Sequence, residues 1–165
     1  MVMHCMPMSQ STRVIDAGES ELIARRMLAT LVEVLAPERG RAQHTLEEAR
    51  ERVRSHLVQE RSVVVSELAG EVVGHKLLRV EDDERGGTTG LFGTIYVAPA
   101  HRRQGIASQL IHFGETWFVK RGKERATTYS DRDNTPRLGL FRRHSFEQRL
   151  MPRDFVAFSR RIGAE

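Results

Sequence analysis

The segment 95–108 combines residue types that could bind a phosphate. Its sequence, IYVAPAHRRQGIAS, is typical of a strand that ends in a sharp turn and leads into a helix. The first N–H groups of a helix have no partner within it and carry the positive end of its dipole. Gly105 and Ala107 have little or no side chain, so the backbone can approach a ligand closely. The pattern predicts an anion site, to which Arg102 and Arg103 add charge-assisted donors.

Other phosphate-binding loops fit the sequence less well. A Walker loop requires G-x-x-x-x-G-K-[ST], and a dinucleotide-binding loop requires G-x-G-x-x-G. Neither string occurs in the chain. The anion site therefore has to be interpreted from the strand–turn–helix context of the segment 95–108.

The elements that precede this segment position it at the end of a strand. Apolar residues recur at helical spacing over 19–35, and Thr45 and Glu48 form a capping box that begins a second helix. A short strand is expected before these helices, at 12–15. Three further β-prone segments follow them, at 62–68, 72–80 and 90–97.

The elements after the segment alternate in the same way. A helix from about Gln104, with Gly122 just past its end, is followed by a strand at 125–130. Thr135 as N-cap, with proline at the first helical position, predicts a short helix to about His144. The tail is β-prone at 155–158. The order β-α-α-β-β-β-α-β-α-β predicts an α/β (α+β) fold, a mixed sheet with helices on both faces.

Size and composition are those of one globular domain. The chain has 165 residues, 39% of them apolar and 29% charged, which suffices for a single core. We expect a flexible tail at 1–11 and one domain at 12–165. No apolar run reaches the roughly 20 residues that span a bilayer. With Cys5 as the only cysteine and no signal-peptide pattern, the expected location is cytoplasmic, without membrane attachment.

Basic residues are concentrated in the C-terminal part of the chain. Residues 1–100 carry 12 basic and 15 acidic side chains, whereas residues 101–165 carry 14 basic and 7 acidic ones. This asymmetry predicts an anionic partner, a phosphorylated cofactor or a nucleic acid. A nucleic acid is the less favoured partner, because no RNP, zinc or helix-turn-helix signature accompanies the arginines. No metal is expected.

The string at 102–107, RRQGIA, resembles the [QR]-x-x-G-x-[GA] motif of the GNAT superfamily of acyl-CoA-dependent N-acyltransferases. A strand ending in Tyr96-Val97 and an amphipathic helix flank it, as in that family. The resemblance covers the range 12–146 and includes Asn134 followed by Phe146. It implies a mostly antiparallel six- or seven-stranded sheet with about four helices on both faces.

The resemblance implies that acetyl-CoA is the cosubstrate and that a deprotonated amine attacks its acetyl group directly. The backbone amides of 103–108 would bind the pyrophosphate, and Val97 N–H would polarise the thioester carbonyl. Asn134 would contact the pantetheine arm. The residues that the resemblance assigns to the cosubstrate are Tyr96, Val97, Arg102, Arg103, Gln104, Gly105, Ile106, Ala107, Ser108, Asn134 and Phe141.

One position departs from the family pattern in a way that affects the chemistry. The frequent general acid of the family is a tyrosine seven residues after the asparagine, and here that residue is Phe141. Phenylalanine has no proton to donate, so the thiolate leaves unaided or Tyr96 or Tyr129 serves. A base is also required unless the amine arrives neutral. Its candidates, by position only, are Tyr96, Asp131, Asp133 and His144.

The function implied is acetyl transfer to a primary amine of a small molecule or peptide. The run 130–135 has some similarity to the aminoglycoside 6′-N-acetyltransferase branch, whose members bind polycationic sugars with acidic side chains. The matching strand stretch, 91–94, has no carboxylate, and the acidic loop 81–84 is interpreted as a solvated hairpin tip. The alternative function is a module that binds or senses CoA with little catalysis, consistent with Phe141. Family members are often dimers, which favours a homodimer.

Overall fold

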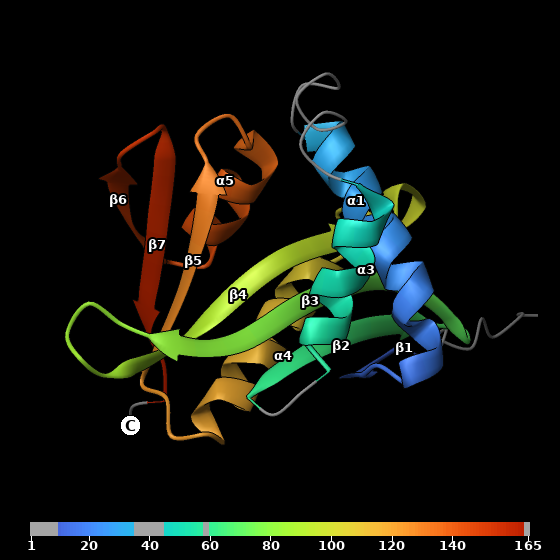
Figure 1. Cartoon of the computed structure of the whole chain (residues 1–165), viewed down its shortest axis with the longest axis horizontal. Coiled ribbons are helices and arrows are strands. Elements are labelled where there is room, and N and C mark those ends of the chain that lie inside the picture. Colours follow the sequence, from blue (N-terminus) through green and yellow to red (C-terminus); the bar gives the residue numbers. More distant parts are fainter. Residues whose placement is uncertain (1–9, 35–44, 58–59, 164–165) are drawn as a thin grey trace, which may run out of the picture.

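The computed structural model describes residues 10–34, 45–57 and 60–163, which form one seven-stranded sheet with helices on both faces (Figure 1). The strand order is β1-β2-β3-β4-β5-β7-β6. The strands are β1 Gln10–Val14, β2 Arg61–Leu68, β3 Glu71–Asp82, β4 Thr88–Val97, β5 Arg125–Asp131, β6 Glu147–Met151 and β7 Phe155–Arg161. The α-helices are α1 Ser20–Val34, α3 Leu46–Ser55, α4 Ile106–Val119 and α5 Thr135–Arg143, with 3₁₀ turns at Ala17–Glu19 and Pro99–His101.

The sheet separates in its middle, between β4 and β5. Every neighbouring pair is antiparallel except β4 and β5, which are parallel and pair only over Gly90–Phe92 and Ala126–Thr128. Just after Phe92, β4 contains a bulge of one extra residue relative to β3. Leu78 pairs with Phe92, whereas Lys76, two residues away on β3, pairs with Ile95, three residues away on β4. The two strands then diverge (Figure 1), so one edge of β4 after Phe92 has no strand beside it.

Each face of the sheet has its own apolar cluster. Along β2, Val63 and Val65 pack with residues of α1 and α3, while Val64 packs with residues of α4 and α5. This alternation is what a strand buried on both faces requires. The cluster under α4 and α5 is rich in aromatic residues and includes Phe92 and Phe141.

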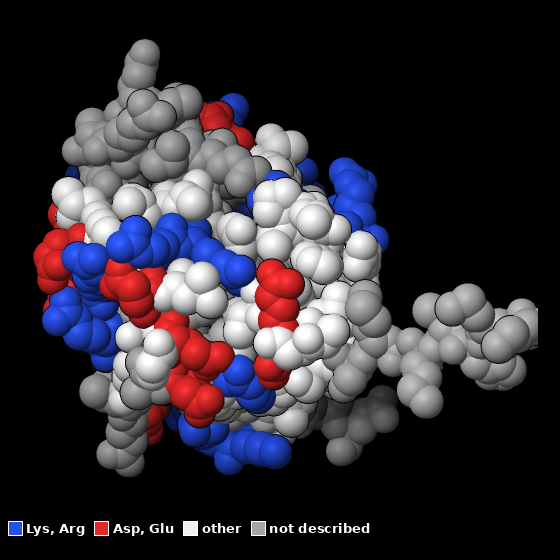
Figure 2. Space-filling view, turned by 90° about the vertical axis from the view of Figure 1, so that its right-hand side faces the viewer, with Lys and Arg blue, Asp and Glu red and all other residues white. Residues whose placement is uncertain are grey.

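Ion pairs join the two helices on the other face. Glu21 of α1 accepts from Arg25 and from Arg50 of α3, and Arg50 and Arg54 both pair with Glu47. Figure 2 shows acidic and basic side chains interspersed over one side of the molecule. Each exposed pair stabilises little by itself, so the register of the helices is fixed chiefly by the apolar cluster beneath them.

The structure confirms the predicted fold class and most elements, and it corrects several details. The capping box forms, with Glu48 N–H donating to Thr45 Oγ1 over 3.2 Å. Asn134, not Thr135, caps α5, because its Oδ1 reaches the Arg137 N–H at 3.2 Å. α4 begins at Ile106 rather than Gln104, after the left-handed backbone of its N-cap.

The ends of the chain differ in part from the prediction. β1 begins at Gln10, within the range predicted as a tail, and the rest of that tail lies outside the described residues. The strand β6 is missing from the predicted order, because four of its five residues are exposed and give no alternating pattern. No helix in the described ranges has the length and apolarity that a membrane crossing requires.

Candidate active site

A cavity of about 1390 Å³ lies where β4 and β5 diverge. Its wall follows β4 from Leu91 to Val97, continues through the loop 101–108, and is completed by the end of β5 and the start of α5. Thr30 of α1 and Arg52 of α3 line it on the opposite face of the sheet. The cavity therefore reaches both faces through the gap that the diverging strands create.

The turn before α4 exposes a row of backbone donors to this cavity. Gly105 caps α4 with a left-handed φ of +82°, and Arg103 also has a positive φ of +59°. Within the described residues, none of the N–H groups of 103–108 donates to a backbone carbonyl, and the next N–H along the chain that does so is that of Gln109. The amides of 103–108 are thus available to an anion, as the sequence predicted for a helix start. Nothing lies within 4 Å of a Cβ built on Gly105, so its backbone conformation, not crowding, requires glycine.

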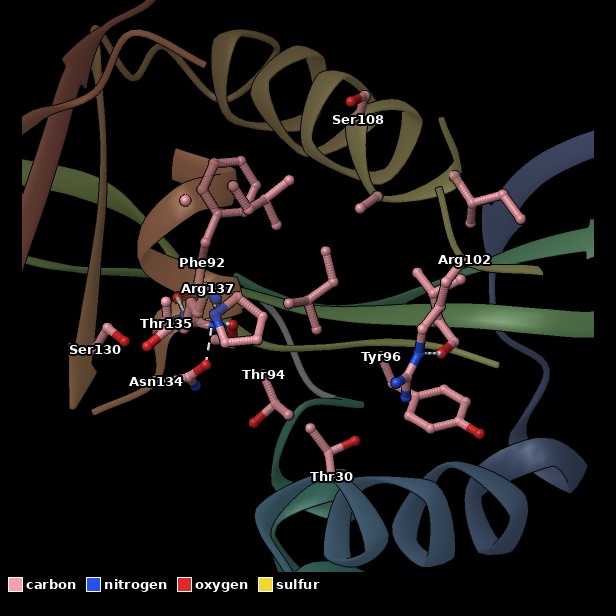
Figure 3. Close-up of a pocket in the computed structure, with 18 of the residues that line it drawn as sticks. Thr30, Phe92, Thr94, Tyr96, Arg102, Ser108, Ser130, Asn134, Thr135 and Arg137 are labelled. Carbon is pink, nitrogen blue, oxygen red and sulfur yellow. Dashed lines mark hydrogen bonds between the residues drawn. The ribbon is translucent and has the colours of Figure 1, made fainter. Parts of the chain in front are cut away.

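The charge of the cavity wall is strongly positive. Arg102 holds the start of this turn by donating from Nε to the Val97 carbonyl over 3.0 Å (Figure 3). Five arginines line the described wall, whereas Asp131 is its only carboxylate. The arginines are Arg52, Arg102, Arg103, Arg137 and Arg143. Such a concentration of guanidinium groups attracts and holds a polyanionic ligand.

Arg137 donates to polar groups of both β4 and β5 at the point where the two strands diverge. Its Nη2 donates to the carbonyls of Phe92 and Gly93 on β4, at 3.3 and 2.9 Å, and to Thr128 Oγ1 on β5, at 2.6 Å. Its Nε donates to the Tyr129 carbonyl over 3.2 Å. Burial lowers the pKa of the Arg137 guanidinium to about 10, so it stays protonated at neutral pH and clamps the two strands.

Asn134 lies in the cavity wall at the start of α5. Asp131 forms the preceding turn, since its Oδ1 accepts from Asp133 N–H over 2.9 Å and its carbonyl accepts from Asn134 N–H over 3.0 Å. Asp131 thus has a turn-forming role, which is typical of aspartate. The Oδ1 of Asn134 caps the helix through Arg137 N–H, so its side-chain NH₂ is the group that remains to donate to a ligand.

The two candidate tyrosines lie on the wall of the cavity but away from α4. The Tyr96 ring stacks on His75, with centroids 5.6 Å apart, and the Arg26 guanidinium of α1 lies 5.4 Å from its centroid. Figure 3 shows Tyr96 and Thr30 on the α1 side and Ser108 on the α4 side. Tyr129 is 43% exposed, and burial together with the nearby acidic loop raises its pKa.

Two of the residues that the resemblance assigned to the cosubstrate do not line the cavity, and neither do the candidate bases Asp133 and His144. Gln104 is exposed beside it, and Phe141 is fully buried in the aromatic cluster, 6.1 Å from Phe92 and 5.0 Å from Phe146 between ring centroids. His144 is only partly solvated, because its Nε2 lies 2.9 Å from the Ser108 Oγ. Burial and neighbouring cations lower the pKa of its imidazole.

Sequence reasoning missed a second group of residues beside the cavity. Arg137 was not among the predicted site residues, and the buried His75 and Lys76 were taken only as part of the strand at 72–80. A visible signal was present, because two ionisable residues interrupt an otherwise apolar strand, VVGHKLL. Such residues in a buried strand are expensive unless paired and are candidates for function.

The sequence model described as the acetyltransferase (GNAT) family matches residues 25–146. The chain belongs to the GNAT acetyltransferase family. It is therefore an acetyltransferase, as the resemblance of the string 102–107 implied. Among curated proteins, none matches the sequence.

Solved structures of other GNAT proteins share the fold at low sequence identity. The yncA protein of Salmonella typhimurium, solved with acetyl-CoA as its cofactor, is 17% identical with a TM-score of 0.75, over 94% of this chain and 95% of that one. The PaiA N-acetyltransferase of Thermoplasma acidophilum, solved with coenzyme A, is 13% identical with a TM-score of 0.74, over 93% and 99%. The ribosomal L7/L12 α-N-protein acetyltransferase RimL, also solved with coenzyme A, is 18% identical with a TM-score of 0.71, over 96% and 98%. These likenesses establish the GNAT fold and leave the acceptor open.

Proposed function

We propose that this GNAT protein transfers the acetyl group of acetyl-CoA to a primary amine of a small molecule or peptide, by direct attack in a ternary complex. The observation that carries the proposal is the row of available amides at 103–108, which opens into a positively lined cavity of about 1390 Å³. This donor set suits a pyrophosphate, and the cavity has room for a long cosubstrate arm and an acceptor.

In this proposal the cosubstrate enters from the α4 side. The amides of 103–108, with Arg102 and Arg103, hold its pyrophosphate. The side-chain NH₂ of Asn134 donates to the pantetheine arm. The N–H of Val97, at the end of the open edge of β4, polarises the thioester carbonyl and so stabilises the negative charge that develops there.

The acceptor would enter from the other face, between β4 and the helices α1 and α3. Thr30, Arg52, Thr94 and Tyr96 line this side of the cavity. Because Asp131 is the only carboxylate of the described wall, these surroundings support an acceptor with few positive charges over a polycationic sugar. Holding the acceptor amine neutral and close to the thioester would supply much of the rate.

A thiol-release assay with acetyl-CoA tests the proposal. The protein is offered amino acids, N-terminal peptides, polyamines and aminoglycosides, and release of CoA is followed with a thiol reagent. The double variant Arg102→Ala, Gly105→Glu should lose turnover, because it removes a donor and places a negative charge in the anion site. Arg149→Ala is the matched control, since this arginine pairs with Glu84 at the surface outside the cavity.

Three outcomes separate the candidate functions. Turnover that the double variant loses and the control keeps supports acetyl transfer and identifies the acceptor class. Tight acetyl-CoA binding without thiol release on any amine would instead support the CoA-sensing alternative. If calorimetry detects no acetyl-CoA binding, both functions are wrong.

A further inference from the structure

Lys76 is among the largest fully buried side chains of the described residues, and its amine forms no ion pair with them. Its exposed fraction is 0%, and its Nζ makes no hydrogen bond within those residues. It lies in the middle of β3, two residues before Leu78, which belongs to the aromatic cluster under α4 and α5. Because side chains alternate along a strand, Lys76 shares this face, and its neighbour His75 faces α1.

The amine lies between two aromatic rings beside the cavity. Its Nζ is 4.6 Å from the ring centroid of Phe92, which lines the cavity, and 5.0 Å from that of Phe141. The electron-rich ring faces can hold an ammonium group. Phe141 is also the residue that stands where the family places its proton-donating tyrosine. The amine therefore lies next to the position from which a hydroxyl is missing.

The titratable groups around Lys76 do not neutralise the charge of its ammonium form. Arg137, at the start of α5, is a cation, and His144, at the end of α5, is engaged with Ser108. No carboxylate of the described residues pairs with the amine. Desolvation by burial, and secondarily Arg137, lowers the pKa of Lys76 well below its ordinary value. A lowered pKa makes the ammonium form of Lys76 a stronger acid than that of an ordinary lysine.

We infer that Lys76 is the general acid for the departing CoA thiolate, in place of the hydroxyl that Phe141 lacks. The inference rests on the proposed acetyl transfer and deepens it. A purely structural role explains the residue poorly, because an apolar side chain would fill the same space without the cost of burying an unpaired amine.

The proton transfer balances without a further reactant. Acetyl-CoA supplies the acetyl group and a thiolate that leaves with the electron pair of the C–S bond as the acceptor nitrogen forms the C–N bond. The ammonium group of Lys76 donates its proton to that sulfur, which gives the free thiol of CoA. The acceptor nitrogen releases its N–H proton to water in the cavity, and the Lys76 amine regains a proton from that water.

The first experiment titrates the thiol of protein-bound CoA and needs no acceptor. The ultraviolet absorbance of the thiolate is followed against pH for the wild-type protein, Lys76→Met and the control Ser66→Ala, which removes another buried unpaired group outside the cavity. Lys76 should stabilise the thiolate, so the pKa of the bound thiol should rise by about one pH unit in Lys76→Met and stay unchanged in the control. Lys76→Gln serves as a second variant if circular dichroism shows that Lys76→Met is unfolded.

The second experiment uses the acceptor identified by thiol release. Lys76→Met should lower kcat about 10- to 100-fold with little change in KM. Restoring a hydroxyl in Lys76→Met, Phe141→Tyr should recover kcat and move the high-pH fall of the profile upward, because a tyrosine keeps its proton to higher pH. A merely structural lysine would give neither the rescue nor the shifted profile.

The outcomes distinguish this inference from the proposed function. Bound CoA whose thiol pKa is the same in the wild type and in Lys76→Met overturns the inference, even if acetyl transfer is found. A thiol pKa that depends on Lys76, in a protein that acetylates no amine, overturns the proposed transfer and supports the thiolate contact. A protein that binds no CoA overturns both.

Discussion

Replacing Arg137 should show how much one side chain contributes to holding the divided sheet together. In Arg137→Gln the carbonyls of Phe92, Gly93 and Tyr129 lose the guanidinium donor that reaches them within 3.3 Å. Hydrogen bonds to charged groups contribute about 1.5–3 kcal/mol each. Arg137 is only partly buried, and its Nη2 is shared among three acceptors. Water will therefore offset part of the loss, and we expect the free energy of unfolding to fall by about 3–4 kcal/mol.

Urea unfolding at pH 7, followed by fluorescence and circular dichroism, measures this loss. Arg142→Gln is the control. Within the described residues, the Arg142 guanidinium donates only to the exposed Gln148 side chain, so this substitution should lower the free energy of unfolding by less than about 0.5 kcal/mol. Arg137→Lys should recover less than half, since an ammonium lacks the planar fork. A loss below about 1 kcal/mol in Arg137→Gln, with an unchanged dependence on urea, would refute the clamp.

Three further changes test the packing and the buried base. Gly114→Ala should destabilise α4 by about 1–3 kcal/mol, although alanine usually favours a helix, because the new Cβ would lie 2.3 Å from the Phe92 ring. In Gly139→Ala of α5 the new Cβ would meet only the flexible end of the Arg143 side chain, so the protein should become more stable by about 0.5–1 kcal/mol. Thermal unfolding of the two glycine variants measures both changes. Burial lowers the pKa of His75 to about 3, so between pH 3 and about 6.5 the unfolded chain binds more protons and stability falls on acidification. Acidifying from pH 6 to 5 should therefore cost the wild type about 1 kcal/mol more than His75→Phe, measured by urea unfolding at each pH.

Local signals were sufficient for the elements that depend on neighbouring residues. The capping box at Thr45 and the glycine before α4 act over a few residues, so the sequence displays them directly. Asn134 was not predicted as the helix cap, because either Asn134 or Thr135 could accept the capping bond until the turn was known.

Contacts between distant segments could not be predicted in the same way. Ser108 and His144 meet although they are 36 residues apart, and Arg137 of α5 reaches backbone carbonyls of both β4 and β5. The environment of Lys76 depends on which face of β3 it occupies. A strand that is buried on both faces has no alternation of polar and apolar residues, so its sequence does not indicate which residues point to which face. The exposed β6 is detectable only through its pairing with β7.

The narrow junction between β4 and β5 also has a mechanical consequence. Three residue pairs join the two parts of the sheet, so the junction has the least backbone hydrogen bonding to resist bending. On the α4 and α5 face, an aromatic cluster that contains Phe92 and Phe158 spans both parts, whereas the cluster under α1 and α3 draws its strand residues from the β1–β3 side alone. We therefore expect the two parts of the sheet to move relative to each other about this junction, held together on the α4 and α5 face and separating on the α1 and α3 face. Amide hydrogen exchange should be fastest along the inner edges of β4 and β5 and slow when a ligand bridges them.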